Sequence, residues 1–132
     1  MQLTPHFTLE ELAGTSKREF KQKNLDEAQK ILGKMYQLAG FAERVREIIG
    51  HPLIINSGYR CVALNNALKG SLTSQHLLAE AIDIRTNAKT PNEIFQILVA
   101  SDLKYDQIIL EKVGNAQWVH VSIGSKKEKL KY

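Results

Sequence analysis

Two short segments alternate between apolar and other side chains, and this alternation constrains the fold more than any other feature of the sequence. In the segment 117–123, valine or isoleucine occupies every second position from Val119, and the segment 81–85 places Ile82 and Ile84 in the same pattern. Successive side chains of a β-strand point to opposite faces, so each segment is predicted to be a strand with its apolar face toward the core. The other face of each strand is then available for polar side chains.

Two further segments extend the predicted sheet. Residues 106–111 are separated from the strand at 117–123 by Gly114 and Asn115, a pair that is typical of a β-hairpin. Residues 53–56 form a short apolar run and are predicted to be another strand. We therefore expect a small antiparallel sheet.

Helical signals lie before and between these strands. Residues 25–49 repeat apolar side chains at helical spacing after Asn24, which is predicted to cap this helix, and Gly50 is predicted to end it. Gly33 and Gly40 are expected to weaken or bend it. Shorter helices are predicted at 8–14, 61–69 and 90–100, with a polar linker at 17–23. Helices that precede and interleave with short strands indicate the α+β class, with the sheet packed against the helices.

Length and composition fit one globular domain. The chain has 132 residues, of which 43% are hydrophobic and 24% charged, so a hydrophobic core can form. We expect a single domain over residues 1–132, in which 1–24 form an N-terminal helix and linker and 124–132 form a frayed basic tail. Cys61 is the only cysteine, which excludes an intramolecular disulfide and a thiolate zinc site.

Net charge and hydropathy indicate which kinds of partner and which cellular location to expect. The formal charge of +4 suits an anionic partner. The sequence lacks the basic patch interleaved with aromatic residues that would favour nucleic acid. No apolar run is long enough to span a membrane, and the N-terminus lacks a signal-peptide pattern. We expect a monomer that is made in the cytoplasm.

Three polar residues are candidates for a metal site. Asp83 and His120 fall at strand positions that point away from the apolar face, and His76 precedes Asp83 by seven residues. Two histidines with one carboxylate are a known zinc ligand set, and they leave a fourth position for water. A lone histidine on a strand is more often hydrogen-bonded or exposed than metal-bound, so spacing alone leaves both interpretations open.

Three ordered motifs resemble those of a known family. They are Ser57-Gly58-Tyr59-Arg60, the segment from Ser74 to Ile84 that contains His76 and Asp83, and Trp118-Val119-His120-Val121-Ser122. The sequence resembles the zinc D-Ala-D-Ala carboxypeptidases and related peptidoglycan peptidases, including phage endolysins, whose patterns are S-G-Y/F-R, S-x-H-x-x-G-x-A-x-D-I/L and x-H-V/I. The likeness extends to the opening segment 7–12 and covers nearly the whole chain.

The resemblance implies a hedgehog/DD-peptidase fold with one Zn²⁺ held by His76, Asp83 and His120. It also implies that Arg60 binds a substrate carboxylate or stabilises the oxyanion, as a planar guanidinium can. Peptidoglycan stem peptides are the implied substrate, cut by a carboxypeptidase or an endopeptidase. Such a protein, made in the cytoplasm, is then expected to reach the cell wall through a phage pore or in a virion. The alternative is a non-catalytic zinc-containing module of the same fold that binds the cell wall or belongs to a virion.

Two positions depart from the family pattern. Ala79 replaces the usual glycine, which is expected to be tolerated if φ is negative there. Gln117 stands where several relatives carry a catalytic glutamate, and an amide cannot accept the proton. Glu111, at the end of the preceding strand, is the next candidate for the general base, because hairpin pairing places it opposite the segment that contains His120.

Four more residues are candidates for contact with the substrate. Tyr59 either lines the pocket or packs in the core, and Trp118 either lies under the substrate or covers the core. Ser74 and Gln75 are candidates for hydrogen bonds to the metal ligands, because a metal-bound histidine needs an outer partner that fixes its tautomer.

Overall fold

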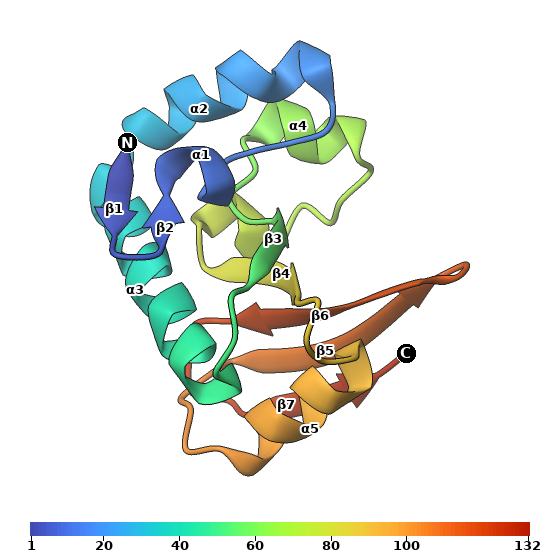
Figure 1. Cartoon of the computed structure of the whole chain (residues 1–132). Helices are drawn as coiled ribbons and strands as arrows, with labels where there is room; N and C mark the ends of the chain where they lie inside the picture. The colour runs from blue at the N-terminus through green and yellow to red at the C-terminus, as the bar shows by residue number, and fades with distance from the viewer.

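Five strands form one sheet in the computed structural model, which describes all residues 1–132. They are β3 (Ile54–Ser57), β4 (Ala81–Arg85), β5 (Gln107–Val113), β6 (Ala116–Ser122) and β7 (Glu128–Lys131), in the spatial order β3-β4-β6-β5-β7. Neighbouring strands are antiparallel except β5 and β7, which are parallel. The predicted antiparallel sheet is therefore a mixed one, and the predicted α+β class is confirmed (Figure 1).

The chain also forms five α-helices and two 3₁₀ turns. They are α1 (Leu9–Leu12), α2 (Lys21–Gln29), α3 (Leu32–Ile49), α4 (Val62–Ala67) and α5 (Pro91–Ala100), with η1 (Arg18–Phe20) and η2 (Gln75–Leu78). A short ribbon of β1 (Gln2–Thr4) and β2 (Phe7–Thr8) lies beside α3. None of the helices combines the length and the apolar character that crossing a membrane requires.

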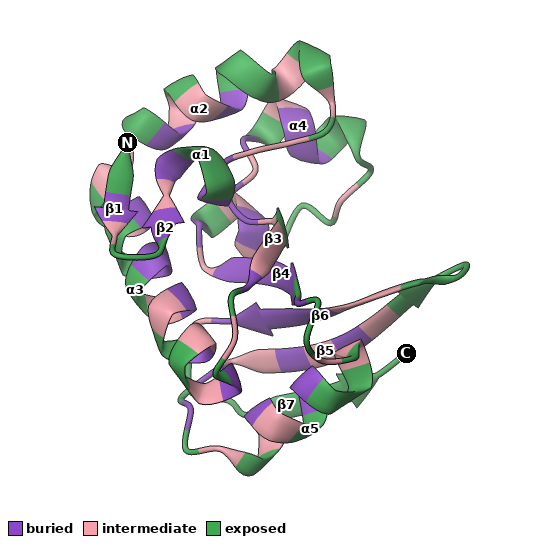
Figure 2. Cartoon of the chain, viewed as in Figure 1, coloured by how far each residue is buried: buried purple, intermediate pink, exposed green.

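One face of the sheet builds the core with α3 and α5. Figure 2 shows buried residues concentrated along β4, β6 and the facing sides of the helices. Fully buried side chains from the strands and helices form one cluster, which includes Ile82, Ile84, Ile108, Val119 and Val121 with Met35, Leu38, Val45, Ile94 and Leu98. Each such side chain contributes about 1.5–3 kcal/mol by its removal from water. The core thus occupies one face of the sheet and leaves the other for polar groups.

Local sequence signals determine several elements directly. Thr90 caps α5, Pro91 occupies its first turn and Glu93 completes a capping box, as predicted. Thr8 and Glu11 form a second capping box at α1. The strand β4 and the β5–β6 hairpin also form where the alternation predicts them.

The predicted helix over 25–49 is wrong at its start. The chain forms two helices that separate at Ile31, whose φ of −129° and ψ of 42° leave the helical region. Asn24 lies inside α2 and caps nothing, because its buried side chain bonds to three distant backbone groups instead. Residues 17–23 are helical over most of their length and are not a polar linker. Helix α3 runs through Gly33 and Gly40 and ends at Gly50, which adopts the left-handed conformation with φ of 78°.

The predicted frayed tail is also wrong. Residues 128–131 form β7, which pairs in parallel with β5 from Gln107 to Leu110. The backbone N–H of Glu128 donates to Asp106, and that of Tyr132 donates to Leu110, at 2.9 Å each. Every side chain of β7 is exposed, so backbone pairing holds this strand rather than apolar burial.

Candidate metal centre

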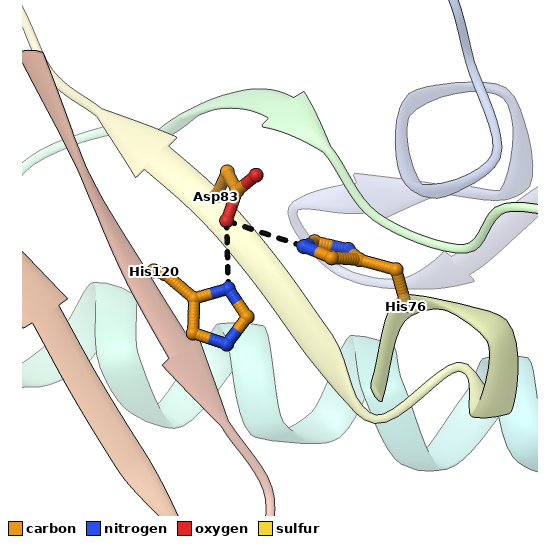
Figure 3. Close-up of side chains that lie close together, drawn as sticks. All are labelled: His76, Asp83 and His120. Atoms are coloured by element: carbon orange, nitrogen blue, oxygen red, sulfur yellow. Dashed lines mark hydrogen bonds and ion pairs between the residues drawn. The ribbon is translucent and has the colours of Figure 1, made fainter. Parts of the chain in front are cut away.

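Three candidate ligands converge on the sheet face opposite the core. Asp83 lies on β4 and His120 on β6, directly opposite each other in the antiparallel register, while His76 lies in the η2 turn that precedes β4. Their residues are only 3–8% exposed. Figure 3 shows both imidazole rings directed at the Asp83 carboxylate. Strand alternation therefore places two ligands side by side, and the short connection before β4 adds the third.

The ligand atoms lie at the separations expected of a single shared ion. Asp83 Oδ1 lies 3.3 Å from His76 Nε2 and 2.9 Å from His120 Nδ1. One ligand atom from each residue lies within 4.8 Å of the others. The two rings lie at an interplanar angle of 70° with centroids 5.2 Å apart, and one nitrogen of each lies beside the same oxygen, Asp83 Oδ1.

The tautomer of His76 is set by its outer hydrogen bond. His76 Nδ1 lies 2.7 Å from the carbonyl oxygen of Gly58, which can only accept, so Nδ1 carries the proton. Nε2 is then the nitrogen that faces Asp83 and the one that is available to bind a metal. Metal-binding histidines use this arrangement, in which a carbonyl fixes the ring from behind. Together with the chemistry of the donors, it shows that this side-chain set fits a zinc ion.

Asp83 supplies the negative charge of the centre. Burial alone would raise its pKa, but hydrogen bonding and charge interactions with His120 and His76 outweigh burial and hold the pKa well below its usual range. The carboxylate is therefore ionised at neutral pH. An ionised carboxylate between two imidazoles is a suitable site for a divalent cation.

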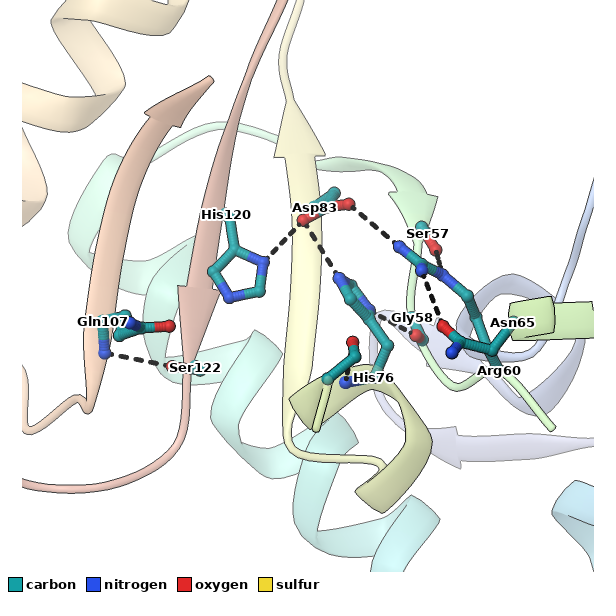
Figure 4. A network of polar contacts seen from close by, with 10 residues as sticks. Ser57, Gly58, Arg60, Asn65, His76, Asp83, Gln107, His120 and Ser122 are labelled. Atoms are coloured by element: carbon teal, nitrogen blue, oxygen red, sulfur yellow. Dashed lines mark hydrogen bonds and ion pairs between the residues drawn. The ribbon is translucent and has the colours of Figure 1, made fainter. Parts of the chain in front are cut away.

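Arg60 follows β3 and reaches the same centre. Its Nε donates to Ser57 Oγ and its Nη1 to Asn65 Oδ1, each at 3.1 Å, while Nη2 lies 3.8 Å from Asp83 Oδ2 (Figure 4). The side chain is 16% exposed. Arg60 is thus a fixed cation beside the ligands rather than a mobile surface residue.

A polar pocket opens onto these residues. Its volume is about 520 Å³, and its lining contains the three ligands, Arg60, Glu111, Ser74 and Gln75. Ser74 accepts a hydrogen bond from the backbone N–H of His76 at 3.2 Å, and Gln75 donates to Asp106 at 3.1 Å. Tyr59 and Trp118 are not among the lining residues. Tyr59 is a member of the core cluster.

Glu111 occupies the wall of the pocket on β5, opposite Trp118. Burial raises the pKa of Glu111, and the charge of Asp83 raises it further, while His120 and His76 oppose this. The indole Nε1 of Trp118 is buried and has no hydrogen-bond partner. Gln117 lies outside the pocket, and its amide donates to Tyr132 instead.

Ala79 adopts a left-handed conformation with φ of 55°, so the negative φ that would favour an alanine is absent. The residue ends η2, and its N–H turns back toward His76. An alanine in this conformation costs about 1 kcal/mol relative to glycine. The chain therefore tolerates this departure from the family pattern with some backbone strain.

Sequence reasoning missed several residues of the pocket. The additional lining residues are Ser71, Thr73, Asp106, Gln107, Ile109 and Lys126. Gln107 and Ile109 share the face of Glu111 by strand alternation, so that pattern gave a signal for them. Lys126 lies in the segment that was predicted to be frayed, so the sequence did not indicate that it lines the pocket.

The fold and the site together define a metal-dependent enzyme class in which two histidines and one aspartate hold an ion in a polar pocket. The chain matches the family model described as Peptidase M15 over residues 5–122, and it belongs to this family of zinc D-Ala-D-Ala carboxypeptidases. No curated protein matches the chain. Family membership indicates a zinc metallopeptidase, and His76, Asp83 and His120 are placed to bind its metal.

Proposed function

We propose that this protein hydrolyses an amide bond in peptidoglycan stem peptides, as a carboxypeptidase or an endopeptidase. One observation carries the proposal: the pocket that contains the three ligands is also lined by two cations, Arg60 and Lys126, and by two further carboxylates, Glu111 and Asp106. A metallopeptidase requires a metal centre, a proton carrier and a group that neutralises negative charge. These three functions have separate residues here.

The residues divide the reaction between them. Zinc, when bound by His76, Asp83 and His120, polarises a carbonyl oxygen and lowers the pKa of water to about 7. Glu111 accepts a proton from the attacking water and transfers it to the leaving nitrogen. Burial of Glu111 raises its pKa toward neutral pH, where a general base is most effective. Arg60 binds the terminal carboxylate of the peptide or stabilises the oxyanion.

The lining of the pocket supports a polar peptide as the substrate. Ile109 is the only hydrophobic residue of the thirteen that line it. Ser71, Thr73 and Gln107 provide hydroxyl and amide groups for hydrogen bonds with a peptide backbone. Such a lining favours stem peptides over apolar ligands.

The non-catalytic alternative rested on Gln117. Because Gln117 lies outside the pocket and Glu111 lies in its wall, the missing glutamate at position 117 no longer favours a wall-binding or virion module. The enzyme is therefore the better supported function.

The decisive experiment compares Glu111→Gln with Glu47→Gln, which changes the same side chain at an exposed site on α3. Zinc-loaded proteins are incubated with defined muropeptides, and mass spectrometry identifies the products. We expect Glu111→Gln to keep one zinc per chain and lose about 10²–10⁴-fold in rate, while Glu47→Gln stays active. His76→Ala, Asp83→Ala and His120→Ala should lose both zinc and hydrolysis. Full activity of Glu111→Gln would remove Glu111 from the mechanism.

Product masses also distinguish the two kinds of peptidase. Loss of one D-alanine from a pentapeptide stem identifies a carboxypeptidase, whereas an internal cut in the stem or the cross-bridge identifies an endopeptidase. If the zinc-loaded protein releases no product from any muropeptide, the result supports the non-catalytic alternative.

A further inference from the structure

The Arg60 guanidinium is held by a residue that lies outside the pocket. Asn65 is on α4 and is completely buried. Its Oδ1 accepts from Arg60 Nη1 at 3.1 Å (Figure 4). Its Nδ2 donates to the backbone oxygen of Ser71 at 3.0 Å. One side chain thus connects the cation of the site to the loop that forms the rim of the pocket.

Gly70 keeps this contact free of obstruction. A Cβ at position 70 would lie 2.2 Å from Asn65 Oδ1 and 3.0 Å from Arg60 Nη1. Gly70 does not have a positive φ, so its backbone conformation does not require glycine. The close approach of the two side chains does require it.

Two hydrogen bonds fix the plane of the guanidinium. Ser57 holds Nε and Asn65 holds Nη1, which directs Nη2 toward Asp83. An arginine side chain without these partners samples many rotamers and loses that freedom only on binding. Fixing it in advance lowers the entropic cost of binding a planar carboxylate or oxyanion.

We propose that Asn65 is a positioning residue that orients Arg60 for the substrate. The claim about orientation stands on the contacts of Asn65 alone, and the claim about the substrate rests on the proposed function. Asn65 itself does not touch the substrate, since the pocket lining includes Arg60 and Ser71 but not Asn65.

The first test measures the orientation without any substrate. Hydrogen exchange of the Arg60 side-chain N–H groups is followed by NMR in the zinc-loaded protein, with Arg60→Lys used to assign the signals. We expect Asn65→Leu to accelerate exchange by about tenfold or more, because a hydrogen bond to a charged group is lost. Asn66→Leu is the matched control, because Asn66 is the exposed neighbour on the same helix. Gly70→Ala perturbs the same contact independently and serves if Asn65→Leu fails to fold.

The second test is a double-mutant cycle on hydrolysis of a synthetic stem pentapeptide, which uses Asn65→Leu and Arg60→Met. We expect Asn65→Leu to reduce kcat/KM by about 10–100-fold in the wild-type background and to have almost no effect beside Arg60→Met. A rise in KM alone would indicate carboxylate binding by Arg60, and a fall in kcat would indicate oxyanion stabilisation.

The outcomes separate the inference from the proposed function. Unchanged Arg60 exchange in both Asn65→Leu and Gly70→Ala overturns the inference, as do losses of kcat/KM that simply multiply in the cycle. If neither the wild type nor any variant hydrolyses a stem peptide, the proposed function is wrong. The exchange measurement still decides whether Asn65 orients Arg60.

Discussion

Gly58→Ala tests how the N-terminal helices position the metal centre. A Cβ at position 58 would lie 2.3 Å from the backbone oxygen of Leu12 and 3.0 Å from its carbonyl carbon. Both are backbone atoms of α1, so no side-chain rotation can relieve the contact. The turn that contains Gly58 must therefore move away from α1.

That movement disturbs two hydrogen bonds. The N–H of Tyr59 donates to Leu12 at 2.7 Å, and the carbonyl of Gly58 accepts from His76 Nδ1 at 2.7 Å. Overpacking costs about 1–3 kcal/mol, and a buried hydrogen bond that is lost adds about 1 kcal/mol. We expect a loss of about 2–4 kcal/mol in the free energy of unfolding of the metal-free protein.

Zinc affinity provides a second readout of the same change. The carbonyl of Gly58 holds the ring of His76 from behind, and loss of such an outer partner reduces metal affinity by about 10–100-fold. Affinity is measured by competition with a chromophoric chelator, and stability by urea denaturation in the absence of metal.

Gly40→Ala is the matched control for this substitution. Gly40 lies inside α3, and a Cβ there would meet no atom within 4 Å. The same chemical change should therefore stabilise the protein by about 0.5–1 kcal/mol and leave zinc affinity unaltered. If Gly58→Ala matches Gly40→Ala in both stability and zinc affinity, the turn that contains Gly58 is not held against α1.

Two further changes probe elements that the sequence did not predict. Asn24→Leu removes the partners of Ala13, Tyr59 and Cys61 backbone groups and should destabilise the protein by about 3 kcal/mol or more in urea denaturation; a loss below 1 kcal/mol would contradict its role. Removal of residues 126–132 exposes the edge of β5 and should lower the melting temperature by several degrees, since about 1–2 kcal/mol of pairing is lost; an unchanged melting temperature would mean that β7 adds no stability.

The direction of two ligands could be predicted because strand alternation is a local signal, whereas the complete set, with His76, came from the resemblance to the peptidase family. Asp83 and His120 fall on the polar side of segments whose apolar side chains the core requires, so their direction follows from their neighbours. The capping boxes at Thr8 and Thr90 are equally local, since each depends on residues within four positions. Such signals predict structure reliably because the backbone groups and side chains that they involve belong to the same short segment.

The elements that could not be predicted depend on distant partners. Asn24 resembles a helix cap in the sequence, yet it bonds to groups 11, 35 and 37 residues away. The tail at 126–132 has neither an apolar face nor a turn signal, and only the free edge of β5 makes it a strand. The orientation of Arg60 likewise depends on Asn65 and Gly70, which no spacing rule connects to a carboxylate-binding site.

The buried contacts of Asn24 connect the N-terminal helices to the metal centre. Asn24 in α2 donates to the carbonyl of Tyr59 and accepts from the N–H of Cys61, so it holds the turn on both sides of Arg60. The same turn presents the carbonyl of Gly58 to His76, and the N–H of Arg60 donates to the carbonyl of His76 at 3.0 Å. A ligand that binds only the folded state stabilises every contact on which its site depends. Zinc should therefore protect α1 and α2 against local unfolding although neither helix supplies a ligand.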